Sequence, residues 1–325
     1  MIKKLLNNKH LNSFIAQVGA SGIAIISFII LVRTMSLEMF GQWGLFLAML
    51  TFLDLLKSGF VATAFIKYSS GENKFVKNEL LASSWVLNIS SLLVITSIFY
   101  PLYFLNIFSN ESINLFLFYY PLYGVISMPY HYNEWNSRID LNMSRLMKIK
   151  IFNAILFLSV CIFSIYEKFS LTQLVIAYIS TFTISSIVSI KTGRTGINII
   201  ANYTQQNLIK LVLFGRYNIL AFLGANLLKS SDTFLISAFL GDKALAIYLI
   251  PQRLWILVIT PLASANTIAF TVFSSNHNKK MFDLLKTNIE KYIGTLTILY
   301  IPFSTFLFIV AEPLVLLVGG DRYIE

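Results

Sequence analysis

The stretch Leu227–Leu254, LLKSSDTFLISAFLGDKALAIYLIPQRL, decides the fold. Two apolar segments flank the short turn Gly241-Asp242-Lys243 and carry Lys229, Asp232 and Arg253. In an antiparallel helix pair, Asp232 lies about eight residues before the turn and Arg253 about nine after it, so both are about 12 Å deep at 1.5 Å per residue. Ionisable groups at membrane depth are costly and usually face a bundle interior or a water-filled cavity. The stretch therefore predicts two membrane-spanning helices whose charges face protein or water.

The composition extends this prediction to the whole chain. Of 325 residues, 56% are hydrophobic and only 12% are charged, against about 25% charged in soluble domains. We therefore predict an all-α polytopic membrane protein. The net charge is +10, but the basic residues are scattered over short loops without a basic aromatic stripe, which argues against a nucleic-acid partner. The single cysteine, Cys161, excludes an intrachain disulfide.

A crossing of the hydrocarbon core needs about 17 to 25 apolar residues. Nine apolar segments near this length are the candidates: Phe14–Met35, Met39–Ala64, Leu80–Leu105, Ile113–Pro129, Ile151–Tyr166, Leu171–Ile190, Tyr217–Leu240, Leu245–Phe273 and Tyr292–Val310. Alternating loops then place 18 basic residues on one side and 4 on the other. The positive-inside rule puts the N-terminus in the cytoplasm. Four aromatic residues near predicted span ends are expected at the membrane interfaces: Trp43, Tyr132, Trp135 and Tyr323.

An internal repeat divides the chain into lobes. A shift of 205 residues brings Val18–Ala20 onto Leu223–Ala225 and Met35–Gly44 onto Leu240–Leu249. Apolar segments also align by chance, but here the register agrees with the predicted turns. Both copies run outward from the cytoplasm, so the lobes would be parallel repeats. We expect a six-helix lobe over 1–192, a cytoplasmic linker over 193–216 and a partial second lobe over 217–325, with the C-terminal end of that lobe missing.

Two motifs resemble bacterial polysaccharide exporters. The first is Met39–Gly44 followed by Leu53–Gly59, a phenylalanine-glycine pair ahead of an aspartate-to-glycine segment. The second is Lys229–Arg253, which looks like the opening of the exporters' second lobe. The family is that of the O-antigen and teichoic-acid flippases, in the superfamily of the multidrug and toxic-compound extruders (MATE).

The resemblance implies a function and a location. It implies a MATE-like fold in the bacterial inner membrane and alternating-access transport of undecaprenyl-diphosphate-linked oligosaccharide, an O-antigen or capsule repeat unit. An O-antigen polymerase and a chain-length regulator would be partners, besides the lipid bilayer itself.

Charged residues within the spans are the candidate site. Arginine and lysine bind phosphate through charge-assisted hydrogen bonds, so Arg253, Lys229 and Lys57 are candidates for binding the diphosphate. Alternatively they neutralise Asp54 and Asp232, because Asp54/Lys57 and Lys229/Asp232 are each three residues apart on one helix face. The two aspartates could instead couple transport to protons or sodium.

Other classes of function have weaker support. The histidines His10, His131 and His277 lie at predicted cytoplasmic edges without metal-ligand spacing, and no Walker loop occurs. We therefore expect no enzyme activity, metal or cofactor. A cation-coupled multidrug exporter of the same fold, a polymerase or ligase acting on the same lipid, and a scaffold for polysaccharide enzymes remain alternatives. The short outward loops leave little room for a polymerase or ligase.

Overall fold

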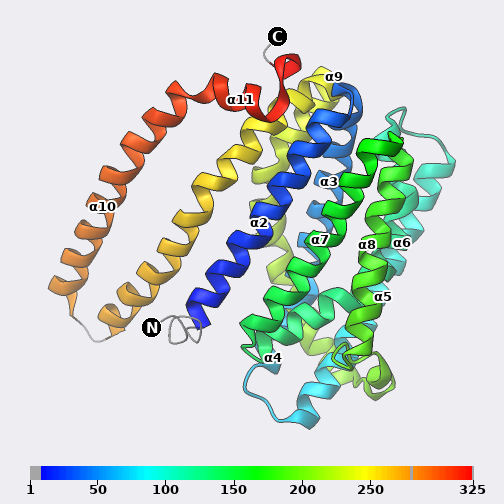
Figure 1. Ribbon diagram of the computed structural model, residues 1–325. Helices are drawn as coiled ribbons and strands as arrows, with labels where there is room; N and C mark the ends of the chain where they lie inside the picture. The colour runs from blue at the N-terminus through cyan, green and yellow to red at the C-terminus, as the bar shows by residue number, and fades with distance from the viewer. Residues whose placement is uncertain (1–8, 279–280, 324–325) are drawn as a thin grey trace. The chain divides into compact units, whose positions relative to one another are not determined.

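The computed structural model of the chain describes residues 9–278 and 281–323 (Figure 1). By its internal contacts the chain forms two compact units, Met1–Ala246 and Ile247–Glu325. Within the described ranges the structure consists of helices and their connections, without a β-strand. The all-α prediction is confirmed. The lobe and linker boundaries expected from the sequence stay a prediction, because the contact division falls elsewhere, inside a helix.

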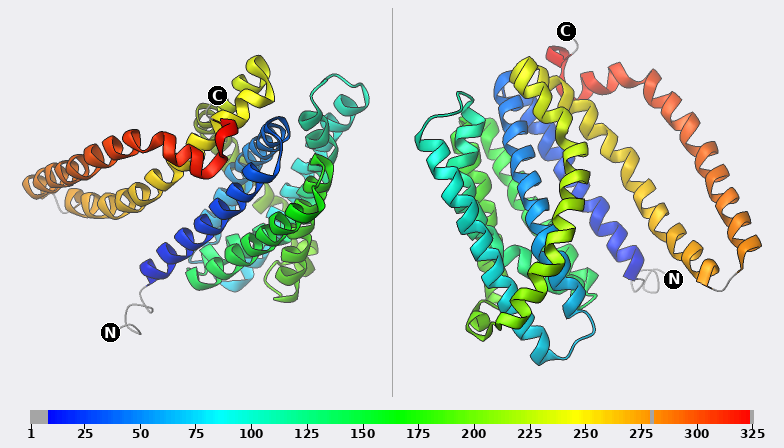
Figure 2. Two further views of the ribbon diagram at one scale, coloured as in Figure 1. Left: turned by 45° about the horizontal axis from the view of Figure 1, so that its top comes forward. Right: turned by 180° about the vertical axis from the view of Figure 1, so that it is seen from behind.

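The first unit contains most of the helices. They are α2 (Lys9–Thr34), α3 (Leu37–Lys57), the π-helix η1 (Ser58–Ala62), α4 (Thr63–Ser69), α5 (Lys74–Phe104), α6 (Glu111–Ile139), α7 (Met143–Glu167), α8 (Leu171–Lys191), the 3-10 helix η2 (Ile197–Asn202) and the start of α9 (Gln205–Asn278). The second unit contains the rest of α9, then α10 (Phe282–Ile309), α11 (Ala311–Gly319) and η3 (Asp321–Tyr323). In the second unit, α10 runs antiparallel to the end of α9 (Figure 2).

The helices begin where short polar side chains precede an apolar run. The Ser36 hydroxyl accepts a hydrogen bond from the Met39 backbone N–H at 3.3 Å and starts α3. Asn73 and Asn110 cap α5 and α6 in the same way, and Ser170 forms a capping box with Gln173 at the start of α8. Each cap satisfies N–H groups that the first helical turn leaves unpaired. The caps thus fix the loops between the predicted spans.

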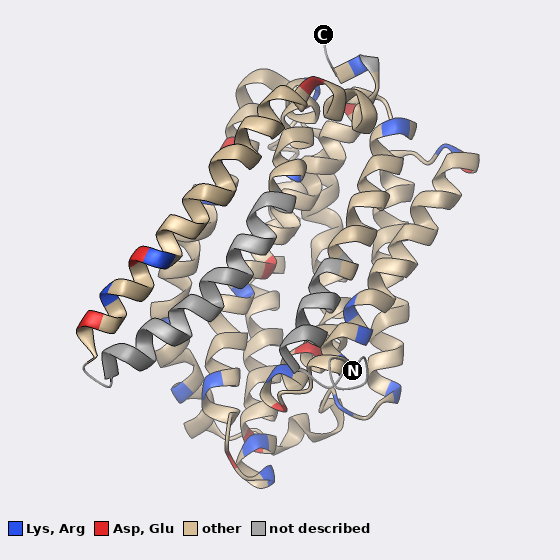
Figure 3. Ribbon diagram, turned by 60° about the vertical axis from the view of Figure 1, so that its left-hand side comes forward, with Lys and Arg blue, Asp and Glu red and all other residues tan. Residues whose placement is uncertain are grey.

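Each of the nine predicted spans lies on a helix or on consecutive helices, but α6, which carries the predicted span Ile113–Pro129, is not among the helices that are long and apolar enough to cross a membrane. By length and composition, six helical stretches in the described part of the chain can cross a membrane: Leu37–Ser69, Lys74–Phe104, Met143–Glu167, Leu171–Lys191, Gln205–Trp255 and Phe282–Ile309. In the first unit the connections alternate between the two ends of the bundle (Figure 1). Lysines and arginines gather at the end where α4 meets α5 (Figure 3), the end that the positive-inside rule assigns to the cytoplasm.

Helix boundaries keep the register of the internal repeat. α9 bends at Gly241, whose φ of 83° and ψ of 176° are not helical. This break lies 205 positions after Ser36, the residue between α2 and α3. The ends of α5 and α10, Phe104 and Ile309, are also 205 positions apart. The parallel-repeat prediction therefore agrees with the order and length of the helices.

The interfacial aromatics were predicted wrongly. Trp43, Tyr132, Trp135 and Tyr323 are only 2%, 0%, 4% and 4% exposed. In the first unit the Trp85 and Tyr132 rings stack at 4.1 Å between α5 and α6. The helix extends beyond the predicted span, because α6 continues past Pro129 to Ile139 and buries this aromatic surface. The outer face exposes apolar side chains instead, as a surface in contact with lipid does.

Candidate functional site

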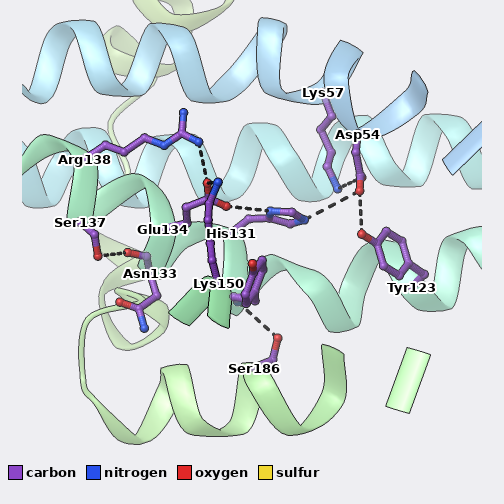
Figure 4. A network of polar contacts seen from close by, with 11 residues as sticks. Asp54, Lys57, Tyr123, His131, Asn133, Glu134, Ser137, Arg138, Lys150 and Ser186 are labelled. Carbon is purple, nitrogen blue, oxygen red and sulfur yellow. Dashed lines mark hydrogen bonds and ion pairs between the residues drawn. The ribbon is translucent and has the colours of Figure 1, made fainter. Parts of the chain in front are cut away.

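A polar cavity of about 330 Å³ lies inside the first unit. Its walls come from α3, η1, α6, α7 and α8 (Figure 4). Asp54 and Lys57 project from the last turn of α3, His131 and Glu134 from α6, and Lys150 from α7. Three basic residues line it, Lys57, Arg138 and Lys150, against the two acidic residues Asp54 and Glu134. Charges are therefore concentrated where the surrounding helices are apolar.

A change of helix geometry follows the α3 charges. Directly after Lys57, residues Ser58–Ala62 form a π-helix. The Thr63 hydroxyl lies within hydrogen-bond distance of the Ser58 and Gly59 carbonyls, at 3.0 and 2.6 Å. Short π-helical turns inside α-helices are frequent at functional sites. Here the turn lies beside the cavity and separates the charged end of α3 from α4.

Pro129 lies inside α6, two residues before His131, and interrupts the ladder of backbone hydrogen bonds of this helix. The ladder is repaired from α8: the Tyr130 N–H donates to the Ser186 hydroxyl at 3.3 Å, and that hydroxyl donates to the Ile126 carbonyl at 2.6 Å. A side chain inserted into the ladder is a common cause of helix bending. The insertion joins α6 to α8 one residue before His131. It thereby fixes the segment of α6 that carries the histidine.

His131 lies between the two carboxylates. Its Nε2 is 3.9 Å from Asp54 Oδ2, and its Nδ1 is 4.0 Å from Glu134 Oε2. The Tyr123 hydroxyl donates to Asp54 Oδ2 at 2.7 Å. Lys150 Nζ is 3.2 Å from Glu134 Oε1. Arg138 Nη2 donates to that same oxygen at 2.6 Å. One imidazole therefore bridges the α3 charges and the α6–α7 charges.

Lys57 is the least satisfied of these groups. Its side chain is 3% exposed and its Nζ lies 3.6 Å from Asp54 Oδ1. Among the described residues this Nζ has no hydrogen-bond partner, and neither has Asp54 Oδ1. A buried ammonium without hydrogen bonds carries a large desolvation cost. Lys57 can therefore donate to an anionic group that enters the cavity.

The other predicted site residues lie outside this cavity. Lys229 and Asp232 are exposed on the segment of α9 before Gly241, in the first unit. Lys229 forms no ion pair with a described residue, so the same-helix pairing with Asp232 is not formed. Arg253 is half-buried and belongs to the second unit. Of the predicted charges, the structure brings Asp54 and Lys57 together.

Sequence reasoning missed His131, Glu134, Arg138 and Lys150. It placed His131 at a cytoplasmic edge and Arg138 in a loop, because the predicted span ended at Pro129. The signal was present in the spacing: positions 131, 134 and 138 differ by three and four residues, which places them on one helix face. Extending the helix through Pro129 would have found them.

Comparison with known proteins identifies the family. A model for the family described as polysaccharide biosynthesis protein matches residues 30–325. The chain belongs to this family. No curated protein matches the chain in sequence. The predicted resemblance to polysaccharide exporters is thus confirmed at the level of the family.

Solved structures identify the fold of this family member. An inward-facing multidrug resistance MATE family transporter of the MOP superfamily matches with a TM-score of 0.73 and 15% identity, covering 93% of this chain and 75% of the other. A MATE protein in complex with MaL6 matches with a TM-score of 0.62 and 14% identity, covering 97% and 76%. The MATE-like fold is confirmed. The family description names polysaccharide biosynthesis, and the solved structures add that the chain has the fold of membrane transporters.

Proposed function

We propose that the protein is an inner-membrane flippase for undecaprenyl-diphosphate-linked oligosaccharide, the repeat unit of an O-antigen or capsule. The observation that carries the proposal is Lys57, a buried cation without a hydrogen-bond partner among the described residues, in a cavity with more basic than acidic side chains. The family match supports the polysaccharide pathway. The orientation with a cytoplasmic N-terminus is part of the same proposal.

The chemistry of the substrate explains why a cationic cavity is needed. A diphosphate in hydrocarbon loses its hydration, which costs many kcal/mol for an isolated ion. A carrier lowers this cost by giving the phosphate oxygens charge-assisted hydrogen bonds in a wet cavity. In this proposal Lys57 binds the diphosphate in the cavity, and Lys229 and Arg253, on the predicted second lobe, are further phosphate-binding residues. An O-antigen polymerase and a chain-length regulator would act with the flippase.

Asp54 has a coupling role in this proposal. Its Oδ2 accepts from Tyr123 and faces His131, while its Oδ1 faces Lys57. A proton or sodium ion on this carboxylate would free Lys57 from its partner and make the ammonium available to the diphosphate. Loss of that ion would restore the Asp54–Lys57 attraction and favour release. Asp232 would act in the same manner on the second lobe.

A cation-coupled multidrug exporter is the second candidate. Its support is the fold, because the first structure named above is described as a multidrug resistance transporter. An exporter of cationic drugs would favour an anionic cavity, whereas three basic and two acidic residues line this one. Resistance of an export-deficient strain to cationic dyes separates the two candidates. Dye resistance without polysaccharide export would favour the drug exporter.

Substitutions of Lys57 and Arg253 test the flippase proposal. We expect Lys57→Met and Arg253→Ala each to reduce surface polysaccharide at least about tenfold, the change expected from losing a hydrogen bond to a charged group. Flipping of a prenyl-diphosphate oligosaccharide into proteoliposomes should fall in parallel. Lys148→Met is the matched control, because Lys148 is exposed and does not line the cavity. Normal polysaccharide at normal protein level would remove the substituted residue from the site.

A further inference from the structure

Two neighbouring hollows lie on α5, outside the candidate functional site. The first is a polar pocket of about 620 Å³ beside the N-terminus of α5, lined also by the loop between α8 and η2. The second is an apolar groove of about 620 Å³ between α5 and α6. Ile197 of η2 lines both. All of these elements belong to the first unit, so the polar pocket opens beside the start of the apolar groove.

The polar pocket offers two uncommitted cations. Lys74 lies in the first turn of α5, and Arg194 lies in the loop after α8. Neither has an ion-pair partner in the described part of the chain, whereas Lys77 in the same wall is 2.6 Å from Asp140. A helix N-terminus adds a favourable field for an anion. In all, three basic side chains and two acidic ones, Glu72 and Asp140, line the pocket, and this excess of positive charge suits a phosphate group.

Amide side chains give the pocket a second kind of partner. Asn78, Asn136 and Asn198 line it. Asn136 is 4% exposed, and its Nδ2 donates to the Arg194 carbonyl at 2.8 Å. This bond fixes the orientation of the amide and leaves Oδ1 without a hydrogen-bond partner among the described residues. A ligand hydroxyl at this wall would satisfy that acceptor, and the volume far exceeds the roughly 30 Å³ of a water molecule.

The groove is apolar and faces outward. Leu93, Leu122 and Val125 line it and are 64%, 49% and 60% exposed. Along α5 it runs from Trp85 to Tyr100, about 22 Å at 1.5 Å per residue. One leaflet of the hydrocarbon core is only about 15 Å thick. A groove of this length suits a polyprenyl chain better than one acyl chain of a phospholipid.

The loop between pocket and groove is held firmly against α5. Trp85 Nε1 donates to the Thr195 carbonyl at 2.8 Å, and the Thr204 N–H donates to the Ser83 hydroxyl at 3.1 Å. Gly196 has a φ of 71°, and a Cβ there would clash with the Leu81 side chain. Only glycine fits this backbone at no cost. The loop that separates the polar pocket from the apolar groove is thus held in one position by the fold.

We propose that pocket and groove together form an entry site for a polyprenyl-diphosphate-linked sugar. The diphosphate lies between Lys74 and Arg194, the sugar contacts the amides, and the prenyl chain follows the groove between α5 and α6. The inference rests on the proposed function, and it adds a docking position distinct from the cavity around Lys57. Substrate would bind here from the leaflet before it reaches that cavity.

Photo-crosslinking of the full chain in nanodiscs tests the entry site. The probe is a polyprenyl-diphosphate monosaccharide with a diazirine in its prenyl chain, and crosslinked α5 and α6 peptides are measured by mass spectrometry. We expect Lys74→Gln combined with Arg194→Gln to lower crosslinking about tenfold, as loss of charge-assisted hydrogen bonds predicts. Val125→Trp, which fills the groove from an exposed position, should lower it as well. The matched controls are Lys191→Gln and Ile187→Trp, at exposed positions that line neither hollow.

The outcomes separate this proposal from the flippase proposal. Lys57→Met should lower flipping at least about tenfold and leave the α5–α6 crosslink intact. Flipping by the unaltered chain without a crosslink on α5 or α6 would overturn the entry site alone, and a crosslink without flipping would overturn the flippase alone. Equal crosslinking of a diazirine phosphatidylglycerol, or displacement of the probe by it at equal concentration, would overturn the entry site in favour of a phospholipid site. Crosslinking unchanged in both the double-cation and Val125→Trp variants would also contradict it.

Discussion

Single residues in the first unit differ in how well their charges are satisfied. Glu134 has two cationic partners, Arg138 and Lys150. Among the described residues, Lys57 has only Asp54 as an ion-pair partner, at a distance too long for a hydrogen bond. Breaking a fully paired buried group costs more than changing a loosely paired one. Glu134 with its two cationic partners is therefore suited to holding α6 against α7. The Asp54–Lys57 pair is suited to separating, so that Lys57 can bind another anion.

Asp140 provides a pH test at the residue scale. Burial raises the pKa of its carboxyl, but the hydrogen bond and charge of Lys77 and the charge of Arg145 outweigh burial, so the pKa is lowered. A lowered folded-state pKa contributes stability above the unfolded pKa of about 3.9, and the contribution is lost as pH falls through the folded pKa. Asp140→Asn should therefore lower the unfolding temperature in detergent at pH 7, and the difference from wild type should close in strongly acidic buffer.

The size of the Asp140 effect should be modest. Its side chain is 38% exposed, and exposed ion pairs contribute about 0.2–1 kcal/mol. A double-mutant cycle of Asp140→Asn and Lys77→Met tests the cause. If the Asp140–Lys77 ion pair carries the loss of stability, the double variant is no less stable than Lys77→Met alone. A gap between wild type and Asp140→Asn that stays constant with pH would contradict the argument.

Helices α3 and α9 touch at the glycine of the first exporter-like motif. A Cβ on Gly41 would collide with the Asp242 backbone, immediately after the bend at Gly241. The Asp242 carboxylate also accepts from the Ser237 hydroxyl at 3.0 Å and from the Asn110 amide at 3.3 Å. The phenylalanine-glycine pattern thus has a physical reason. It allows the start of α3 to approach the α9 bend backbone to backbone.

Gly41→Ala tests this element contact. We expect a loss of about 1–3 kcal/mol in the free energy of unfolding, as overpacking at a close contact costs, measured as a lower unfolding temperature in detergent. Gly224→Ala is the control: Gly224 is helical, and nothing lies within 4 Å of the position of its Cβ. There alanine should be neutral or stabilising, because it restricts the unfolded chain more than glycine does. Equal stability of the two variants would refute the close contact.

At the scale of the whole molecule, the charge distribution over the loops predicts how the first unit is oriented in the membrane. Basic residues gather at the end of the first unit where α4 and α5 meet (Figure 3). The loop between α5 and α6 lies at the opposite end (Figure 1). The positive-inside rule concerns loops as short as these. The two ends should therefore differ in their access from outside the cell.

Cysteine labelling tests the orientation. The single native cysteine, Cys161, is buried, so Cys161→Ala gives a background without thiols. On it, Ser109→Cys between α5 and α6 should react with an impermeant maleimide in intact cells. Glu72→Cys, in the loop between α4 and α5, should react only after the membrane is permeabilised. The reverse pattern would invert the topology and would place the Lys74–Arg194 pocket outside the cytoplasm.

The sequence determined the features that depend on local pattern. The apolar runs, the turn at Gly241 and the 205-residue register follow from the order of residues along the chain. The pairing of Asp54 with Lys57 follows from their spacing of three residues on one helix. The resemblance carried by Met39–Gly44 and Leu53–Gly59 led to the correct family and fold.

Only the tertiary structure decided which distant charges share a cavity. Ser186 of α8 repairs α6 at Pro129, so α6 continues and brings His131 between Asp54 and Glu134. No local rule gives this, because the repairing hydroxyl is 60 residues away from the Ile126 carbonyl that it bonds. The polar pocket and the apolar groove on α5 likewise form only because η2 packs against that helix. Helix continuation through a proline and contacts between distant segments are decided by packing in three dimensions, where the satisfaction of buried polar groups outweighs local propensity.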